Sequence, residues 1–238
     1  MGTKIEWADA TWNPITGCTP ISEACENCYA KRMANRLAGR FGYGTLYPFS
    51  VTFHRDRLDE PLKWKKPRRV FVCSMGDLFH ESIDFRGNEI RDIFRVMAAS
   101  DSTFMLLTKR PQRMAECIEF LYGDYFPEQM PNVWLGTTVE NQRHDDRIIA
   151  LQQIPAAVRF VSFEPLLGPF DFLPPWLRFI DWAICGGETG PGARPMDLEW
   201  ARSLRDQLRT AGVPFFFKKV GGGREIPDDL NVREFPNK

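Results

Sequence analysis

The chain has 238 residues, of which 43% are hydrophobic, and its 31 lysines and arginines balance its 31 aspartates and glutamates. This length suffices for one substantial core and fits a single α/β barrel. The balanced charge excludes the overall basic bias that favours nonspecific nucleic-acid binding. Residues 1–9 carry charges where a signal peptide needs an apolar core, and no stretch approaches the roughly 20 apolar residues of a membrane span. We therefore expect a cytoplasmic protein that makes no membrane contact.

Seven short runs of β-branched and aromatic residues predict strands, with helix-period segments between them. In chain order the runs are residues 11–16, 69–73, 103–108, 133–139, 159–163, 181–185 and 214–220. Such alternation is typical of βα units that build a mostly parallel sheet. The expected fold class is α/β, a single partial or distorted TIM-type (β/α) barrel of about six to seven parallel strands.

Two of the intervening helices are predicted from apolar residues at helical spacing. The apolar positions are Ile90, Ile93, Phe94 and Met97 in one helix, and Leu198, Ala201, Leu204, Leu208 and Ala211 in the other. Both stripes indicate core, and Gly212 is a stop signal for the second helix. We expect one barrel domain over residues 1–223 and an irregular C-terminal tail over residues 224–238.

Near the amino terminus, Cys18, Cys25 and Cys28 form a CX6CX2C pattern without an obvious fourth ligand beside it. Clustered cysteines in a cytoplasmic protein are more often metal or redox ligands than disulfide partners. Three thiolates on a cubane iron–sulfur cluster leave one iron open to a small molecule. The remaining cysteines lie in apolar or helical surroundings and are expected to be small buried hydrophobes. They are Cys73, Cys117 and Cys185.

Other interpretations of the three cysteines stay open. A structural zinc site completes four ligands with Cys or His, and here it would use His54 or His80, neither of which is closely spaced to the cysteines. A thiol–disulfide couple suits the CXXC spacing of Cys25 and Cys28 but leaves Cys18 unexplained. A nucleophilic cysteine has the least support, because the sequence suggests no histidine partner for it.

Polar residues follow the predicted strands at their carboxyl ends, where ligands bind in parallel α/β sheets and barrels. The segments are residues 74–77, 108–111, 137–142, 162–165, 186–190 and 218–223. Each alone is equally compatible with helix capping, an ion pair or a tight turn. Because all of them share one edge with the three cysteines, we interpret them together as one site.

Several of these strings resemble a known family. The three-cysteine loop after the first strand, with small and acidic residues after the second, resembles the radical S-adenosylmethionine superfamily. More closely, the chain resembles a phage-associated three-cysteine-motif family, which is uncharacterised in substrate and is sometimes grouped near spore photoproduct lyase. The strings that carry this resemblance are TWNPITGC from Thr11, CYA from Cys28, SMGDLF from Ser74, LTKRP from Leu107, SFEPLL from Ser162 and GGE from Gly186.

The resemblance implies an enzyme with two cofactors. Cys18, Cys25 and Cys28 would hold three irons of a [4Fe-4S] cluster, and S-adenosylmethionine would chelate the fourth through its amino and carboxylate groups. An electron from the reduced cluster would cleave a carbon–sulfur bond to give methionine and a 5′-deoxyadenosyl radical, which abstracts hydrogen from the substrate. An external electron donor such as flavodoxin or ferredoxin is implied. The protein would position the cofactor and exclude water.

The resemblance also implies residues that contact S-adenosylmethionine. Ser74, Gly76 and Asp77 stand where the superfamily contacts the methionine amino group, and a carboxylate at Asp77 suits an ammonium. By the same logic, Lys109 suits the methionine carboxylate.

The other implied contacts involve the rest of the cofactor or the substrate. Glu140 would take the ribose hydroxyls, and Ser162 and Glu164 would line the adenosine or substrate side. The string Gly186-Gly187-Glu188 resembles the superfamily's amino-group motif but follows the sixth strand, so we expect a turn that faces substrate or adenine.

Two features depart from the superfamily pattern. Its cysteines are commonly spaced CX3CX2C, whereas this loop has three extra residues before Cys25. The position before the third cysteine commonly holds an aromatic residue whose backbone meets adenine. Here that position is Asn27, and the aromatic Tyr29 follows Cys28 instead.

Two functions follow as hypotheses. The first is a radical S-adenosylmethionine enzyme that acts on a nucleobase or nucleotide, and an enzyme reaching a base in a duplex would have to extrude it. The second is a noncatalytic zinc or iron–sulfur binding module that docks nucleic acid or a partner protein. A local basic run near Trp64 either meets phosphates or is a solvated loop. Its residues are Lys63, Lys65, Lys66, Arg68 and Arg69.

Overall fold

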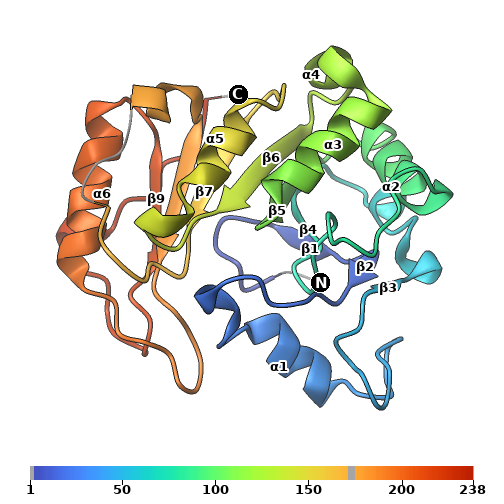
Figure 1. Ribbon diagram of the computed structural model, residues 1–238, viewed down its shortest axis with the longest axis horizontal. Coiled ribbons are helices and arrows are strands. Elements are labelled where there is room, and N and C mark those ends of the chain that lie inside the picture. The colour runs from blue at the N-terminus through green and yellow to red at the C-terminus, as the bar shows by residue number, and fades with distance from the viewer. Residues whose placement is uncertain (1–2, 171–174, 238) are drawn as a thin grey trace.

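A seven-stranded parallel sheet forms the centre of the computed structural model, which describes residues 3–170 and 175–237. Its strands, in spatial order, are β1 (Ala10–Trp12), β4 (Arg69–Val72), β5 (Thr103–Thr108), β6 (Val133–Thr138), β7 (Arg159–Phe163), β8 (Trp182–Gly186) and β9 (Phe215–Lys219). Spatial order follows chain order, as in a TIM barrel, but the described parts of β1 and β9 do not pair with each other. The sheet is therefore an open, curled half-barrel (Figure 1), and the expected α/β fold class is confirmed.

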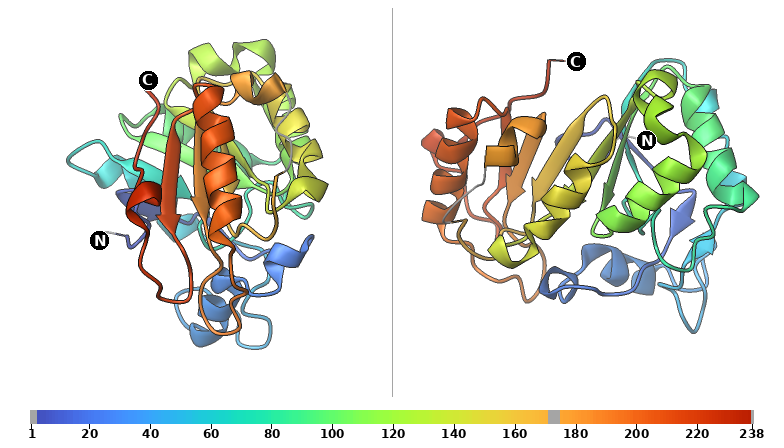
Figure 2. Two further views of the ribbon diagram at one scale, coloured as in Figure 1. Left: turned by 90° about the vertical axis from the view of Figure 1, so that its left-hand side faces the viewer. Right: turned by 45° about the horizontal axis from the view of Figure 1, so that its top comes forward.

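Helices cover one face of the sheet, which we call the outer face (Figure 2). They are α2 (Asn88–Ala98), α3 (Pro111–Leu121), the short α4 (Phe126–Gln129), α5 (Asp146–Gln152) and α6 (Leu198–Thr210). By contrast, α1 (Tyr29–Arg36) lies beyond the carboxyl ends of the strands. Short 3-10 turns are Glu23–Cys25, Arg55–Arg57, Pro61–Lys63, Gly123–Tyr125, Gln142–His144, Pro175–Phe179 and Asp228–Leu230. No helix in the described ranges is long and apolar enough to cross a membrane.

The period-two alternation of strand side chains divides the core into two parts. Outer-face residues such as Val72, Leu106 and Leu135 pack with the helices. Inner-face residues form a second, aromatic-rich cluster with the amino-terminal Trp7. They include Phe71, Met105, Trp134, Phe160, Trp182 and Phe216. Both faces of the half-barrel are therefore covered by apolar side chains.

The two predicted helical stripes are confirmed with one exception. In α2 the four predicted core residues are buried, and in α6 Ala201, Leu204 and Leu208 are buried. Ala211 is exposed, so its assignment to the core was wrong. The reason is that α6 ends at Thr210, and Gly212 then turns the chain with a φ of 72°.

The first predicted strand is divided in two. β1 pairs with β4, whereas β2 (Ile15–Thr16) pairs antiparallel with β3 (Thr52–Phe53) in a separate two-stranded sheet. Pro14 lacks a backbone N–H for a ladder hydrogen bond, and the side chain of Asn13 accepts one from Met75 N at 2.9 Å. One continuous strand over residues 11–16 was therefore a wrong prediction. The break directs the chain across the carboxyl end of β4.

The C-terminal tail is irregular apart from one 3-10 turn, and it packs along β9 as part of the core. Phe217 N donates to Val232 O at 2.9 Å, and Trp182 Nε1 donates to Glu234 O at 2.8 Å. Leu230 is fully buried. The described part of the tail, up to residue 237, therefore completes the half-barrel.

The burial of Ile93 in α2 predicts how much stability its side chain contributes. Ile93 is 0% exposed, whereas Ile149 in α5 is 44% exposed. Replacing Ile93 with Ala should lower the free energy of unfolding by about 2–5 kcal/mol, because it leaves a cavity against the sheet. The matched change Ile149→Ala should cost less than about 1 kcal/mol. Urea denaturation measures both, and equal losses would contradict the packing of α2.

Candidate functional site

The cysteine loop, residues 17–28, lies over the carboxyl edge of the sheet, between β2 and α1 (Figure 2). Cys18, Cys25 and Cys28 are each partly exposed and free of disulfides. Cys28 immediately precedes the first residue of α1. The three thiols are therefore available as ligands at the edge where the sequence predicted a site. Cys73, Cys117 and Cys185 are buried in the core, as expected.

The loop packs closely against the segment that follows β4. Gly17 and Gly76 form a parallel bridge, and a Cβ atom on Gly76 would lie 2.9 Å from Gly17 O. A Cβ on Gly17 would lie 2.1 Å from Ser50 O, and Gly17 has a φ of 89°. The Tyr29 hydroxyl donates to the carbonyl of Ser74. Ser74 and Gly76, two of the predicted contact residues, therefore lie directly against the cysteine loop.

Arg110, at the start of α3, anchors the first cysteine. It is 5% exposed, and its Nη1 donates to Cys18 Sγ at 3.4 Å and to Asp77 Oδ2 at 3.0 Å. Its Nη2 donates to Thr19 O at 3.2 Å. Thr108 Oγ1 donates to Asp77 Oδ1 at 2.8 Å. The predicted site residue Asp77 is thus half of a buried ion pair beside Cys18, so an ammonium would share it with Arg110.

Sequence reasoning gave Lys109 a role in ligand binding, whereas it considered Arg110 only as a structural ion-pair partner for a carboxylate such as Asp77, and the structure contains that pair. A buried arginine that bonds a residue 92 positions away leaves no local sequence signal. The only available signal was its place in the segment that follows the third strand.

Cys18 and Cys25 ionise differently. Burial and the neighbouring Asp77 charge raise the pKa of Cys18 to about 11. Burial alone would also raise the pKa of Cys25, but the charge of Lys109 and backbone hydrogen bonds outweigh it and lower that pKa. Lys109 is therefore close enough to the second cysteine to stabilise its thiolate.

A second anchor holds the middle of the loop. Glu23 Oε1 accepts from Asn141 Nδ2 at 2.6 Å, and Glu23 Oε2 lies 3.0 Å from His144 Nε2. The hydrogen bond with His144 is the main cause that lowers the pKa of Glu23 to about 2. Glu140 lies behind this pair, wholly buried, with Oε2 accepting from Arg147 Nη1 at 2.8 Å. The predicted ribose ligand is therefore not exposed on the edge.

A third anchor holds the residue before the third cysteine. Asn27 Nδ2 donates to Glu188 Oε2 at 2.9 Å, and Arg194 Nε donates to the same oxygen at 3.0 Å. Arg32, in α1, bridges Asn27 O and Thr189 O with hydrogen bonds of 2.8 and 2.7 Å. Glu188, two residues after β8, therefore holds the cysteine loop through Asn27, the residue before the third cysteine.

Ser162 and Glu164 lie at the end of β7. Ser162 is buried, and both carboxylate oxygens of Glu164 accept from Lys218 Nζ at 2.8 Å. A Cβ on Gly186 would lie 3.3 Å from Glu164 Cδ, so β8 approaches this ion pair closely. Glu164 and Lys218 are partly exposed, with side-chain exposures of 18% and 12%. This pair is a polar group on the edge that a ligand can reach.

The two histidines considered as zinc ligands are hydrogen-bonded to hydroxyl groups at or beside the cysteine loop. His54 Nε2 lies 2.7 Å from Thr16 Oγ1, and the two ring nitrogens of His80 lie 2.9 Å from Thr19 Oγ1 and Ser82 Oγ. Among the described residues, one set of three ligating side chains converges closely enough for one ion. That set is Glu23, Glu140 and His144, and the three cysteine sulfurs do not converge in this way.

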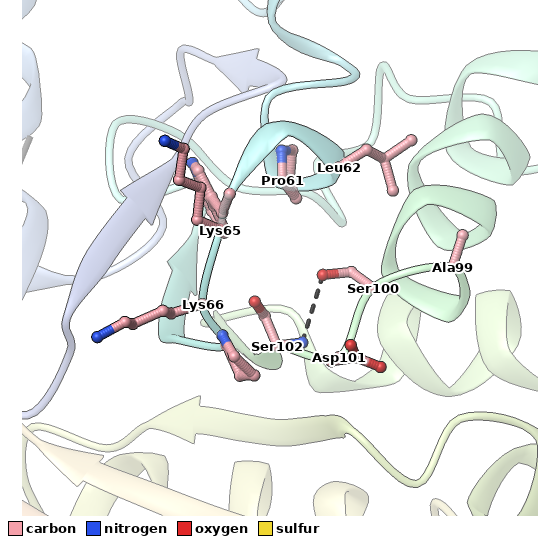
Figure 3. Close-up of a pocket in the computed structure, with 10 residues that line it drawn as sticks. Pro61, Leu62, Lys65, Lys66, Ala99, Ser100, Asp101 and Ser102 are labelled. Atoms are coloured by element: carbon pink, nitrogen blue, oxygen red, sulfur yellow. Dashed lines mark hydrogen bonds between the residues drawn. The ribbon is translucent and has the colours of Figure 1, made fainter.

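The basic run lies at the opposite edge, because it precedes β4. It borders a surface pocket of about 140 Å³ that Ser100 and Ser102, before β5, also line (Figure 3). In this pocket Ser102 N donates to Ser100 Oγ at 3.3 Å. Arg68 lies 5.2 Å from the centre of the Trp64 ring, as in a cation–π contact. A phosphate bound here would lie at the amino ends of the strands, away from the cysteines.

Another cavity, of about 360 Å³, lies at the carboxyl ends of β8 and β9. Its lining residues are Thr189, Gly190, Lys219, Gly221, Gly222, Gly223 and Arg224. Its volume is within the range of small-molecule pockets, about 300–1,000 Å³. Arg32 bonds Thr189 O, so this cavity borders α1 and the cysteine loop.

A family model described as "Protein of unknown function (DUF5131)" matches residues 2–231. The chain belongs to this family. No curated protein and no solved structure matches it. The family description names no activity, so the function has to be argued from the chemistry of the site itself.

The pKa of Cys18 is raised and that of Cys25 is lowered, and this difference predicts how fast each thiol reacts at a given pH. At about pH 8, iodoacetamide should alkylate Cys25 faster than Cys18, because the thiolate is the nucleophile. The rate at Cys18 should rise only as the pH approaches the pKa of about 11. Mass spectrometry of the metal-free protein measures both rates, and Lys109→Met should slow Cys25 alone. Faster labelling of Cys18 at pH 8 would contradict the assignment.

The buried ion pair gives a second prediction. Arg110→Met should lower the free energy of unfolding by about 3–5 kcal/mol, because it leaves the Asp77 carboxylate buried without its partner. The double variant with Asp77→Leu should recover part of that loss. Arg113→Met, in the same helix but partly exposed, should cost less than about 1 kcal/mol. Urea denaturation checks all three, and equal losses at Arg110 and Arg113 would refute the anchor.

Proposed function

We propose that the chain is a radical S-adenosylmethionine enzyme whose cysteine loop holds a [4Fe-4S] cluster, with a nucleobase or nucleotide as substrate. One observation carries this proposal. Three partly exposed thiols lie at the carboxyl edge of a parallel half-barrel, and the Nε2 atoms of the two histidines weighed as a fourth ligand are hydrogen-bonded to the hydroxyls of Thr16 and Thr19. Ligands of such folds bind at this edge.

The donor set suits a cluster better than a single zinc ion. A zinc ion holds four ligands at one centre, with bonds of about 2.0–2.3 Å. In a cubane cluster each thiolate binds a different iron, so the sulfurs lie further apart. The three cysteine sulfurs do not converge at a common point, which supports the cluster. With three cysteine ligands, one iron keeps an open position for S-adenosylmethionine.

When bound, the cluster supplies the electron that reductively cleaves S-adenosylmethionine and so generates the 5′-deoxyadenosyl radical. The electron would come from an external donor such as flavodoxin or ferredoxin. Lys109, whose charge acts on Cys25, is suited to the methionine carboxylate. Ser74, Gly76 and Asp77 are suited to the amino group, because they lie against the loop beside Cys18.

The substrate side of the proposed site is the part of the edge formed by β7, β8 and β9. Ser162 and the Glu164–Lys218 pair lie there, next to the cavity lined by Lys219 and Arg224. These cations suit the phosphate of a nucleotide. The basic run at the opposite edge does not reach this cavity, so the proposal assigns it no part in substrate recognition.

Anaerobic reconstitution with iron and sulfide tests the proposal. About four irons and four sulfides per chain are expected, with a reduced signal in electron paramagnetic resonance that shifts when S-adenosylmethionine is added. Reduction should then release 5′-deoxyadenosine, measured by chromatography. Tightly held stoichiometric zinc with neither response would instead support the noncatalytic binding module and refute the enzyme.

Matched cysteine variants control this experiment. Replacing Cys18, Cys25 or Cys28 with Ala should abolish the cluster signal and 5′-deoxyadenosine release. Cys117→Ala removes a buried thiol of α3, on the side that packs into the hydrophobic core, and should leave the cluster signal and 5′-deoxyadenosine release unchanged. Loss of the cluster in a folded Cys117→Ala variant would mean that the ligand set is misassigned.

A further inference from the structure

A second group of ligating side chains lies beside the cysteine loop. Glu23 belongs to the 3-10 turn inside the loop, Glu140 follows β6, and His144 ends the next 3-10 turn. One ligand atom from each lies within 4.8 Å of the other two. We call these three residues the carboxylate–histidine cluster. It joins the loop to the end of β6 and shares no residue with the cysteine ligands.

The distances in this cluster suit one shared ion. His144 Nε2 lies 3.0 Å from Glu23 Oε2 and 3.6 Å from Glu140 Oε1. Bonds of about 2.0–2.2 Å from carboxylate and imidazole to one ion place neighbouring ligand atoms about 3.0–3.5 Å apart. An ion between the three atoms therefore requires only small movements of the side chains.

Glu140 provides an independent indication of a ligand. The side chain is 0% exposed, and Oε2 accepts from Arg147. Oε1 points toward His144, and no described donor lies within hydrogen-bond distance of it. A buried carboxylate oxygen without a partner is costly. A cation bound to Oε1 would remove that cost.

Hydrogen bonds from surrounding side chains orient Glu23 and Glu140, in the way that metal ligands are oriented in proteins. Asn141 Nδ2 and Arg143 Nη2 both donate to Glu23 Oε1, at 2.6 and 2.8 Å, and so leave Oε2 turned toward His144. Arg147 likewise fixes the second oxygen of Glu140. Hydrogen bonds of this kind hold metal ligands in place in proteins.

We propose that Glu23, Glu140 and His144 bind one divalent transition-metal ion of the series from Mn²⁺ to Zn²⁺. Two carboxylate oxygens and one imidazole nitrogen are the donors that these ions accept. The side chains of Glu23 and His144 are 25% and 22% exposed, which leaves room for water as further ligands. The proposal gives Glu140 to a cation instead of a ribose, and it does not depend on the proposed enzymatic function.

The bound ion would hold the cysteine loop. Glu23 lies between Cys18 and Cys25, in the interval that is three residues longer than the common CX3CX2C spacing. The longer interval carries a 3-10 turn that presents Glu23 to the end of β6. The extra residues thus attach the loop to the half-barrel at its middle.

A titration of the full-length, metal-free chain with Mn²⁺ tests the site by electron paramagnetic resonance of the unbound ion. Mn²⁺ favours oxygen and nitrogen ligands over thiolates, so the cysteines should not compete. One bound equivalent per chain is expected. Glu23→Gln and His144→Gln should each weaken binding at least about 10-fold, since each removes one of three ligands. His80→Gln is the matched control, because His80 lies 3.5 Å from a single carboxylate, that of Glu81.

A second measurement covers the case in which a variant folds poorly. Mn²⁺ should raise the melting temperature of the wild-type chain in a concentration-dependent way, because it binds only the folded state. No bound Mn²⁺ at millimolar concentration, with no change in melting temperature, would show that the cluster is an ion pair alone. Equal weakening by His80→Gln would also overturn the proposal. Neither result bears on the cysteines, so the radical enzyme would stay under separate test.

Discussion

The position of the cysteine loop depends on three carboxylates that fasten it to the carboxyl edge of the half-barrel. The loop has one 3-10 turn of its own, and side-chain contacts supplement its few backbone hydrogen bonds, such as that from Cys18 N to Phe49 O at 3.3 Å. Asp77 holds the start through Arg110, Glu23 holds the middle through His144, and Glu188 holds the end through Asn27. Each contact joins the loop to a segment that follows a different strand. The sheet therefore holds the loop at its start, middle and end.

Buried ion pairs of this kind are a poor source of stability, because removing charges from water costs about as much as their attraction returns. What they provide at this edge is a single arrangement, because Arg110 contacts Asp77, Cys18 and Thr19 at once. Moving the loop would break several charged hydrogen bonds together. These contacts therefore fix the orientation of Cys18 and add little to the stability of the half-barrel.

Local patterns in the sequence predicted the sheet well and the anchors poorly. Strands such as residues 103–108 are readable because a short apolar run, residues 104–107, is bounded by β-branched threonines. The first strand was predicted wrongly at Pro14, because proline has no backbone N–H to continue the hydrogen bonds between β1 and β4. Asn27 and Glu188 are 161 residues apart, so their contact exists only once the half-barrel has formed. The carboxyl-edge rule predicted that the cysteine loop and the polar segments after the strands share one edge, but not which side chains hold the loop there.

Because of these anchors, folding of the chain does not require the ligands that the loop is proposed to bind. Small zinc domains fold only with their metal, because they lack a core of their own. Here the outer and inner faces of the sheet each bury an extensive apolar cluster, and the three thiols of the cysteine loop contribute to neither. The thiols of Cys18, Cys25 and Cys28 thus lie at the carboxyl edge of a sheet whose core needs no metal. Binding of such a ligand would have to remove the proton from the partly exposed Cys18, whose pKa is about 11, but it would not have to order the chain.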